Sequence, residues 1–278
     1  PYKIMKSKNK HPSGYDVIGD IHGHADELKA LLEKLHYIDD GKCYYHPSRQ
    51  AVFLGDFIDR GLQQRDVIQI VMPMVKAGAA LSVLANHELN ALAYHTVDPS
   101  NPRTWLRPRN NKNTQQHIAF LNDYLDMGRE QELQEVLAWF KTLPLWLDLN
   151  GLLVVHACWD TTSVKVLEGQ LGDNNNLTDA LLVKASRKNT PEYHAVEVLL
   201  KGWEATIADG GSFQDKDGNL RHEVRTKWWL TERTPLREAT LASDEIIKTL
   251  PEDQFIDAEQ FLGYDNESML CLGHYWRE

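Results

Sequence analysis

Side chains that are good metal ligands follow five apolar runs of this 278-residue sequence. These side chains are Asp20, His22, Asp56, Asn86, His156 and His274. Carboxylate, imidazole and amide donors together suit Mn, Fe or Zn. Two such ions held about 3.5–4 Å apart can clamp a phosphoryl group and activate the water that attacks it in line. We therefore expect two divalent metal ions, bridged by Asp56, and hydrolysis of phosphate esters by a metal-bridging hydroxide.

Three side chains next to the candidate ligands are suited to proton transfer and phosphate binding, which complement the action of the metal ions. His87 is placed beside Asn86, where it can protonate the leaving oxygen as a general acid. Asp59 is expected to accept a hydrogen bond from His87, which fixes the tautomer of the histidine and raises its basicity. Arg60 carries a guanidinium group that matches phosphate oxygens. The neutral amide of Asn86 limits the negative charge that would repel an anionic substrate, so we predict that it lies against the substrate as well as a metal.

The apolar runs themselves are expected to be strands that carry these ligands at their carboxyl ends. Helical spacing of leucine and valine follows the first two runs, and the runs are continuously apolar rather than alternating. This pattern is typical of parallel strands covered on both faces, and ligands of such sheets bind beyond the carboxyl ends of the strands. The predicted strands are residues 15–19, 51–55, 80–85, 152–155 and 269–273.

Two long stretches interrupt the alternation of strands and helices, near residues 90–149 and 161–248. The first contains a polar segment, 110–116, which we expect to be a loop before amphipathic helices. The second has helical patterning over 177–186 and 191–203. We interpret both as insertions that form lids or walls of one domain covering residues 1–278.

The composition excludes several classes of protein. A formal net charge of −10 argues against a nucleic-acid-binding surface, which needs basic patches. No apolar stretch approaches the roughly 20 residues of a membrane-spanning helix. The three cysteines are scattered, which favours a reducing compartment over a disulfide framework. We expect a cytoplasmic protein with no membrane segment, whose partner is a phosphorylated substrate.

Three short motifs resemble the signatures of one enzyme family. They are Gly-Asp-Ile-His-Gly at 19–23, Gly-Asp-Phe-Ile-Asp-Arg-Gly at 55–61 and Asn-His-Glu at 86–88. They resemble the phosphoprotein phosphatase family of calcineurin-like metallophosphoesterases, and Asp-Arg-Gly narrows the choice within that superfamily. The sequence looks most similar to the bacterial branch, which includes bis(5′-nucleosyl)-tetraphosphatase-like and Ser/Thr phosphatase-like enzymes. The match is dense over about residues 15–90 and sparse afterwards.

The resemblance implies an α/β fold, a β-sandwich of mixed sheets flanked by helices. It also implies a role for each candidate residue. One metal ion would be bound by Asp20, His22 and Asp56, and the second by Asp56, Asn86, His156 and His274. His87 and Asp59 would form the acid pair, and Arg60 would contact phosphate.

The sequence departs from the family pattern in three places. Ala85 replaces the usual glycine before Asn-His-Glu, which costs little unless a positive φ is needed there. The second phosphate-binding arginine has no clear counterpart; by order it is Arg225 or Arg221, and from the first insertion it is Arg107 or Arg109. The sequence also ends four residues after His274, where the family continues through further strands. Either this protein ends compactly or its C-terminus is incomplete here.

The sequence is compatible with two classes of substrate. The leading expectation is a Ser/Thr-type protein phosphatase-like phosphomonoesterase, with an open groove over the metals. The alternative is hydrolysis of dinucleoside polyphosphates, which needs basic and aromatic side chains such as Trp105, Arg103, Arg107 and Arg109. A third reading is a catalytically silent binding module, which the retention of His87 and of all six ligands disfavours.

Overall fold

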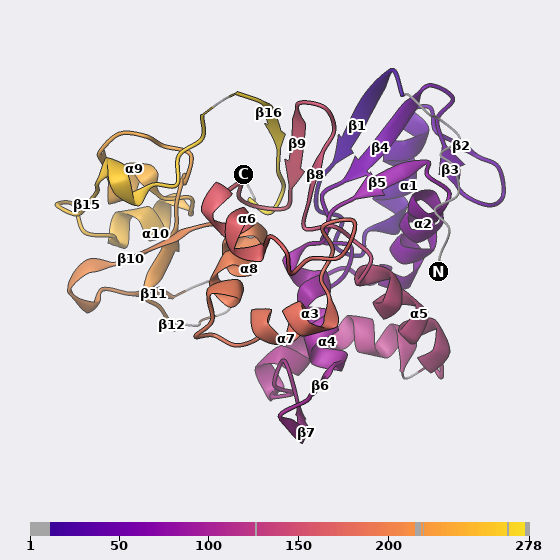
Figure 1. The fold of residues 1–278 in the computed structure, drawn as a ribbon, viewed down its shortest axis with the longest axis horizontal. Helices are drawn as coiled ribbons and strands as arrows, with labels where there is room; N and C mark the ends of the chain where they lie inside the picture. The colour runs from indigo at the N-terminus through magenta and orange to yellow at the C-terminus, as the bar shows by residue number, and fades with distance from the viewer. Residues whose placement is uncertain (1–11, 126, 215–217, 219, 266, 276–278) are drawn as a thin grey trace.

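Two three-stranded sheets lie next to each other in the upper part of the view in Figure 1. The computed structural model describes residues 12–125, 127–214, 218, 220–265 and 267–275. The first sheet has the order β1-β4-β5 and all of its strands are parallel. The second has the order β16-β9-β8, in which β16 and β9 are parallel and β9 and β8 antiparallel. These strands are β1 (Gly14–Ile18), β4 (Arg49–Phe53), β5 (Ala80–Ser82), β8 (Trp146–Asp148), β9 (Leu152–Val155) and β16 (Met269–Cys271).

The central strand β4 explains why the two sheets form layers. Ala51, Val52 and Phe53 are all completely buried, as the continuous apolar run predicted. Because side chains alternate between the faces of a strand, Val52 packs with Val154 of the second sheet, whereas Phe53 belongs to the core beneath the helices. Helices α1 (Ala25–Lys34) and α2 (Gln64–Lys76) contribute to that core. The predicted α/β class and mixed sheets are thus confirmed.

Four of the five predicted strands end slightly earlier than the sequence pattern indicated, and 152–155 ends as predicted. The strands end at residues 18, 53, 82, 155 and 271, so that none to three residues separate each strand from its candidate ligand. The apolar residues 54–55 and 83–85 are still buried, but their backbone has left the ladder to turn toward the site. Hydrophobic patterning reports burial rather than hydrogen bonding, and it therefore extended the strands too far.

The first insertion contributes helices that close over one end of the first sheet. It holds the end of α3 (Asn86–His95), the hairpin of β6 (Val97–Asp98) and β7 (Asn101–Trp105), then α4 (Asn111–Tyr124) and α5 (Glu130–Phe140). The expectation of a polar loop over 110–116 was wrong. Helix α4 begins there because the Asn110 side chain accepts a hydrogen bond from the Asn113 N–H, which is a normal helix N-cap.

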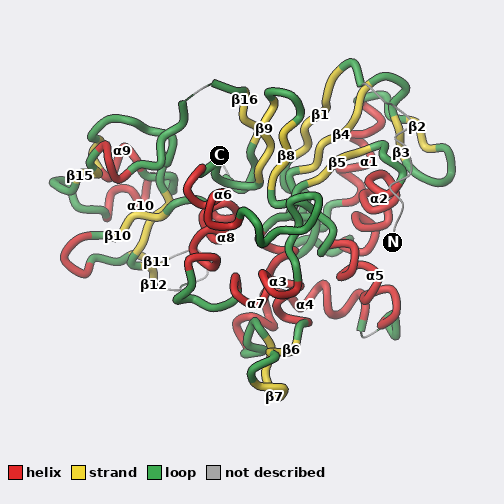
Figure 2. The backbone as a smooth tube through the Cα atoms, in the orientation of Figure 1, coloured by secondary structure: helices red, strands yellow, loops and turns green. Residues whose placement is uncertain are grey.

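The second insertion contributes helices to the main core, and its later part, together with the residues that follow it, builds a separate, smaller hydrophobic core. Helices α6 (Thr161–Leu167), α7 (Asp179–Ala185) and α8 (Pro191–Lys201) pack near the second sheet, and the patterning over 177–186 and 191–203 predicted the latter two correctly. The chain then forms the lobe at the left of Figures 1 and 2. Its core includes Ala205, Val224, Leu236, Ile256 and Phe261.

The remaining elements are short. The helices are α9 (Leu236–Ala239), α10 (Asp244–Thr249) and the 3₁₀ helices η1 (Ala208–Gly210) and η2 (Ala258–Gln260). The strands are β2 (Ile38–Asp39), β3 (Tyr44–Tyr45), β10 (Glu204–Thr206), β11 (Phe213–Gln214), β12 (Leu220–Arg221), β13 (Glu223–Arg225), β14 (Thr234–Pro235) and β15 (Phe255–Ile256).

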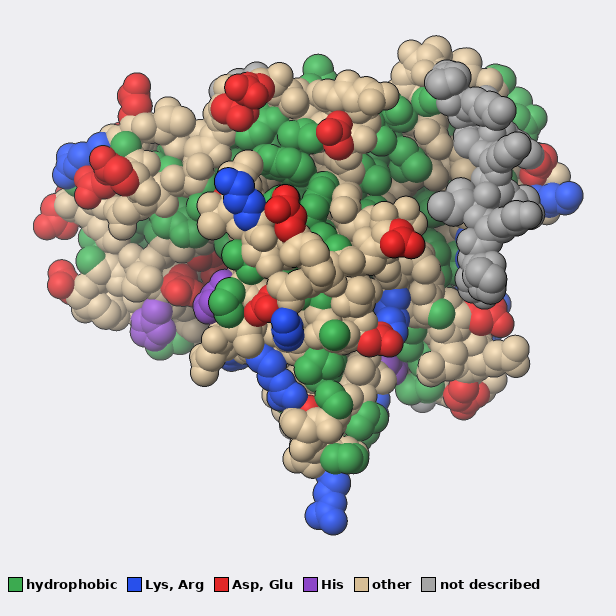
Figure 3. Space-filling model, in the orientation of Figure 1, with side chains coloured by type: hydrophobic (Ala, Val, Ile, Leu, Met, Phe, Trp, Pro, Cys, Tyr) green, Lys and Arg blue, Asp and Glu red, His purple; other side chains and the backbone are tan. Residues whose placement is uncertain are grey.

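The surface carries charges of both signs. On the face drawn in Figure 3, Lys and Arg side chains alternate with Asp and Glu and do not merge into one basic patch. Within the described ranges, none of the helices combines the length and apolarity that crossing a bilayer requires.

Candidate active site

Asp56 lies at the centre of the candidate ligands. It follows β4, and it is only 2% exposed. One of its oxygens, Oδ2, is 3.5 Å from Nε2 of His22 and 3.4 Å from Nε2 of His156. Two groups of possible ligand atoms, each within 4.8 Å of one another, share this carboxylate: His22, Asp56 and His87 on one side, and Asp56, His156 and His274 on the other.

Backbone carbonyls orient two of the histidines toward Asp56. Nδ1 of His22 donates to the carbonyl of Ile58 at 2.9 Å, and Nδ1 of His156 donates to that of Leu54 at 2.6 Å. A histidine that donates one ring N–H in this way presents its other nitrogen as a ligand, the arrangement common behind metal-binding imidazoles. Both Nε2 atoms therefore face the carboxylate in the orientation that a shared cation needs.

The charges of this cluster are strongly coupled. Burial opposes ionisation of Asp56, but His156, His87 and His22 outweigh it and hold the pKa of the Asp56 carboxyl far below its ordinary value. Burial likewise disfavours a charged His156, yet Asp56 raises the pKa of its imidazole to about 9. The pKa of His22 is lowered, chiefly by burial. Asp56 therefore keeps its negative charge although its side chain is almost completely buried.

Two observations are compatible with a cation in the second group. Nε2 of His156 lies 3.0 Å from Oδ1 of Asn86, so a ligand atom of each side chain is directed at the other. Nε2 of His274 is buried and has no hydrogen-bond partner among the described residues. Burial also lowers the pKa of His274 well below its ordinary value, which leaves the imidazole in the neutral form that binds metals. The residues present thus fit a divalent metal ion.

Asp20 joins the site through the C-terminal strand segment. Its Oδ1 accepts a hydrogen bond from the His274 backbone N–H at 3.1 Å. A Cβ atom on Gly273 would lie 2.6 Å from the same oxygen, so only glycine allows this approach. The structure therefore brings together residues separated by more than 250 positions, and all six predicted ligands line one site.

Backbone strain is concentrated at these residues. Nine described residues other than glycine have a positive φ, and five of them are candidates at this site. Such conformations cost of the order of 1–3 kcal/mol each and persist where the surroundings over-determine them, as at functional sites. The five are His22 (φ 46°), Asp56 (φ 52°), Asp59 (φ 64°), Arg60 (φ 74°) and His274 (φ 66°).

Glu88 supports this strained loop, a role that the sequence analysis did not assign. Its carboxylate is fully buried and accepts hydrogen bonds from the backbone N–H groups of Asp56 (2.9 Å) and Phe57 (2.8 Å). Burial, reinforced by the Asp56 charge, raises the pKa of Glu88 to about 7. The Asn-His-Glu motif thus joins the start of α3 to the loop that carries Asp56.

His87 and Asp59 form a buried pair beside the ligands. Nδ1 of His87 lies 2.6 Å from Oδ2 of Asp59, and both side chains are almost completely buried. Burial disfavours the imidazolium, but the charges of Asp56 and Asp59 outweigh it and raise the pKa of His87. A histidine that keeps its proton in this way has the property required of a general acid.

Asp59 has a second histidine partner, which the sequence analysis missed. Nδ1 of His117, from α4, lies 3.0 Å from Oδ1 of Asp59. Nothing local in the sequence relates His117 to the motifs. The available signal was its helical spacing with Phe120 and Tyr124, which places it on the buried face of α4.

Two of the candidate arginines lie near the ligands. Arg60 is exposed, and its charge helps to lower the pKa of His22, after the larger effects of burial and of His87. The Arg225 charge contributes similarly to the lowered pKa of His274. Arg225 Nε is 3.9 Å from Glu204 Oε1, whereas Arg221 is the closer partner of Glu204, at 3.2 Å.

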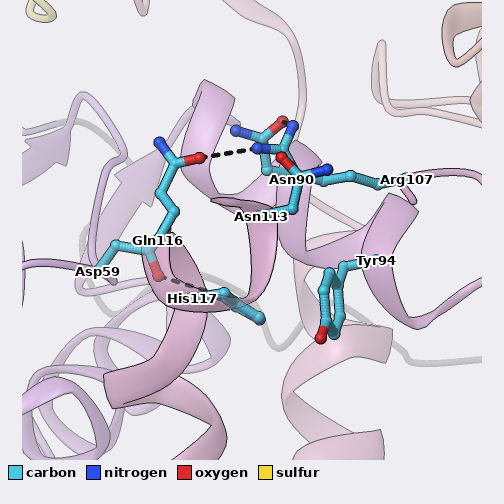
Figure 4. Close-up of a pocket in the computed structure, with 7 residues that line it drawn as sticks. All are labelled: Asp59, Asn90, Tyr94, Arg107, Asn113, Gln116 and His117. Atoms are coloured by element: carbon cyan, nitrogen blue, oxygen red, sulfur yellow. Dashed lines mark hydrogen bonds and ion pairs between the residues drawn. The ribbon is translucent and has the colours of Figure 1, made fainter. Parts of the chain in front are cut away.

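The arginines of the first insertion are engaged elsewhere. Arg107 donates to Asn90 Oδ1 and to Gln116 Oε1, both at 2.8 Å, and borders a small cavity on the far side of Asp59 (Figure 4). Arg109 lies 3.8 Å above the ring of Trp105. That aromatic face, which a nucleobase would need, is thus already covered by a guanidinium group.

Several curated proteins are similar to parts of this chain. It is 42% identical over 146 residues to bis(5′-nucleosyl)-tetraphosphatase PrpE of Bacillus velezensis, an alignment that covers 51% of this chain and 55% of the relative. It is 45% identical over 74 residues to the protein of the same name from Halalkalibacterium halodurans, covering 26% of this chain and 30% of the relative. A symmetrical bis(5′-nucleosyl)-tetraphosphatase of Nitrosococcus oceani is 29% identical over 143 residues, covering 51% and 42%. The chain thus spans between about a third and about half of these relatives.

Solved structures resemble the chain only distantly. A cold-active protein tyrosine phosphatase of a Shewanella species has a TM-score of 0.40 and 20% identity, over 66% of this chain and 59% of that one. A putative diadenosine tetraphosphatase has a TM-score of 0.33 and 18% identity, over 75% and 64%.

A family model extends well beyond these partial alignments. The model for calcineurin-like phosphoesterases matches residues 15–220, which include five of the six candidate ligands and the His87–Asp59 pair. This match covers most of the sequence, so the chain belongs to the calcineurin-like phosphoesterase family.

Proposed function

We propose that this protein hydrolyses phosphate esters or anhydrides with the help of two divalent metal ions. The observation that carries the proposal is the position of Asp56, which belongs to both groups of candidate ligands and lies beside the buried His87–Asp59 pair. Asp20, His22 and Asp56 would hold one ion, and Asp56, Asn86, His156 and His274 the other. When bound, such ions polarise phosphoryl oxygens and lower the pKa of water.

The side chains around the ligands have separate tasks in this proposal. His87 donates a proton to the leaving oxygen, while Asp59 holds its Nδ1 and so keeps the ring in one orientation. Arg60 and Arg225 bind phosphate oxygens that face away from the ligands. Asn86 contributes an oxygen without adding negative charge, which lowers the repulsion between the site and an anionic substrate.

Among substrates we favour dinucleoside polyphosphates over phosphoproteins. Relatives that are 42% and 43% identical over 146 residues carry the name bis(5′-nucleosyl)-tetraphosphatase. This preference reverses the order of the two substrate classes that the motifs suggested, because the motifs are shared by enzymes of both kinds. Arg107 and Arg109 are already engaged, so we assign phosphate binding to Arg60 and Arg225.

A substrate panel tests the proposal. With Mn²⁺ present, diadenosine tetraphosphate should give a higher kcat/KM than a phosphoserine peptide or p-nitrophenyl phosphate. Chelation of metal should abolish all three activities, and added Mn²⁺ should restore them. A preference for the phosphopeptide would instead favour the protein phosphatase reading. No turnover of any of the three substrates would favour a binding module.

A further inference from the structure

The carboxylate of Asp59 serves two histidines, one on each oxygen. Oδ2 is 2.6 Å from Nδ1 of His87, and Oδ1 is 3.0 Å from Nδ1 of His117. The three side chains are buried, with 4% exposure for that of Asp59 and 6% for each histidine. A carboxylate is only an acceptor when ionised, so both ring nitrogens donate to it. Burial opposes this charge, but the bonds from His117 and His87 lower the pKa of Asp59.

His117 reaches Asp59 from a different part of the chain than the motifs. It belongs to α4 in the first insertion, 58 residues after Asp59. Its ring stacks on Phe120 at a centroid distance of 4.8 Å and lies 5.3 Å from the ring of Tyr94. Figure 4 shows the imidazole of His117 directed at Asp59 from α4. Packing thus fixes the ring, while a hydrogen bond fixes its direction.

Asp59 is the one hydrogen-bond partner of the His117 ring in the part of the chain that the structure describes. Nε2 of His117 is buried and unpartnered there. The adjoining cavity has a volume of about 10 Å³, the size of one water site, and Arg107 borders it as well. An imidazole in an apolar helix face is costly to bury unless its polar atoms are used. The hydrogen bond to Asp59 satisfies one of the two ring nitrogens of His117.

We propose that His117 is a positioning residue for the general acid, an inference that rests on the proposed function. A carboxylate held by one histidine can rotate about its Cβ–Cγ bond, and His87 would rotate with it. With His117 on the second oxygen, the carboxylate plane is fixed, and so is the direction of the His87 ring. The first insertion therefore takes part in catalysis through Asp59, not only as a wall of the site.

A pair of matched variants tests this role. His117→Leu removes the donor at similar volume, whereas His117→Asn keeps an N–H near the position of Nδ1. We expect His117→Leu to lower kcat about 10-fold with little change in KM, the usual cost of losing a group behind a working residue. His117→Asn should recover most of kcat. His95→Asn alters a neighbouring ring 5.6 Å from that of His117, and should change kcat less than 2-fold.

Comparing two phosphate esters distinguishes a misplaced general acid from a nonspecific disturbance of the active site. Phenol is a much weaker acid than p-nitrophenol, so its phosphate ester depends more on protonation of the leaving oxygen. The loss in His117→Leu should therefore be larger with phenyl phosphate than with p-nitrophenyl phosphate. Equal losses with both esters, or equal losses in His117→Leu and His117→Asn, would overturn the proposal.

NMR of the metal-free protein tests the role of His117 independently of catalytic activity. The Nδ1–H proton and ¹⁵N signals of the His87 ring in the metal-free protein report its hydrogen bond to Asp59. They should be single and sharp in the wild type, and shifted or broadened by exchange between ring orientations in His117→Leu. Unchanged signals would contradict the positioning role even if the enzyme is active. If the wild type turns over neither ester with Mn²⁺, the proposed function fails instead.

Discussion

At the scale of residues, the site is defined by which groups keep or lose a proton under burial. Asp56 stays ionised because three histidines surround it, whereas the pKa of Glu88, two residues after Asn86, rises to about 7. His87 gains basicity from two carboxylates, and His274 loses it through burial. The carboxyl groups of Asp56 and Glu88 thus differ in pKa, and so do the imidazoles of His87 and His274. These differences agree with the proposed roles of Asp56 and His274 as ligands and of His87 as the acid.

Replacing Asp56 by Asn should nearly abolish activity. We expect kcat/KM to fall at least about 100-fold, because even groups behind metal ligands typically cost 10- to 100-fold. The bound metal, measured by elemental analysis, should fall too, and the rise in Tm on adding Mn²⁺ should shrink. Asp66→Asn, at an exposed carboxylate in the first turn of α2, is the matched control. Wild-type activity in Asp56→Asn would refute the bridging role.

His95 should make the stability of the protein depend on pH. Burial, helped by His117 and Arg109, lowers the pKa of His95 from 6.5 to about 3. The unfolded chain therefore takes up the proton first, and stability present above pH 6.5 is lost progressively as the pH falls toward 3. At pH 5 this loss is about 2 kcal/mol.

The variant His95→Gln separates the contribution of His95 to the pH dependence of stability from that of other titrating groups. Chemical denaturation of the wild type and of His95→Gln at pH 7 and pH 5 gives two differences in the free energy of unfolding. The wild type should lose about 2 kcal/mol more than the variant over this interval. Equal losses would indicate that His95 is accessible to protons in the folded protein.

At the scale of elements, the site depends on tight turns that follow the strands. The turn after β4 passes Gly55, which has a φ of 88° and lies against Ala85 at the start of α3. Ala85 has an extended φ of −114°, so the alanine that replaces the family's glycine needs no special backbone. The close approach of the two segments therefore leaves no room for a side chain at position 55, whereas the methyl group of Ala85 is accommodated.

Gly55→Ala should be strongly destabilising. Its Cβ would lie 2.4 Å from the Cβ of Ala85, in addition to about 1–2 kcal/mol for the left-handed backbone. We expect a loss of at least about 2 kcal/mol in thermal or urea unfolding, together with reduced activity. Adding Ala85→Gly should recover the part that is due to the contact, whereas Ala85→Gly alone should cost less than about 1 kcal/mol. No recovery in the double variant would show that backbone strain alone is responsible.

At the scale of the whole molecule, the described residues form a main core, a small apolar cluster between the two central sheets, and a separate smaller core in the lobe. The smaller core gathers apolar residues between Ala205 and Phe261, in the lobe at the left of Figure 1. Arg225 extends from β13 of that lobe, and its charge acts on His274. We propose that the main core and the core of the lobe belong to one domain, because a segment of roughly 60 residues has only a marginal core of its own.

Unfolding experiments test the single-domain proposal. Thermal unfolding followed by tryptophan fluorescence and by far-UV circular dichroism should give coincident transitions. Leu236→Ala, at a completely buried position of the smaller core, should lower the stability of that one transition by about 2–5 kcal/mol. If Leu236→Ala split the curve into two transitions, the lobe would be an independent unit.

The sequence by itself indicated the five strands that precede the candidate ligands, the six candidate ligands and the neighbouring His87, because these features are local: apolar runs report burial, and the candidate ligands follow them closely. It also indicated the α/β class, which follows from the same alternation. It did not indicate β8 or most of the short strands. The sequence could not show that 110–116 begins a helix, since polar residues are equally common in loops and on exposed helix faces.

The tertiary structure alone decided how distant segments meet. It brought the charge of Arg225 close enough to lower the pKa of His274, engaged Arg107 with Asn90, and brought His117 from α4 onto Asp59. It also joined Asp20 to the backbone of His274, across 254 residues. These contacts depend on how helices and sheets pack, and packing is set by the shapes of many side chains at once rather than by any spacing along the chain.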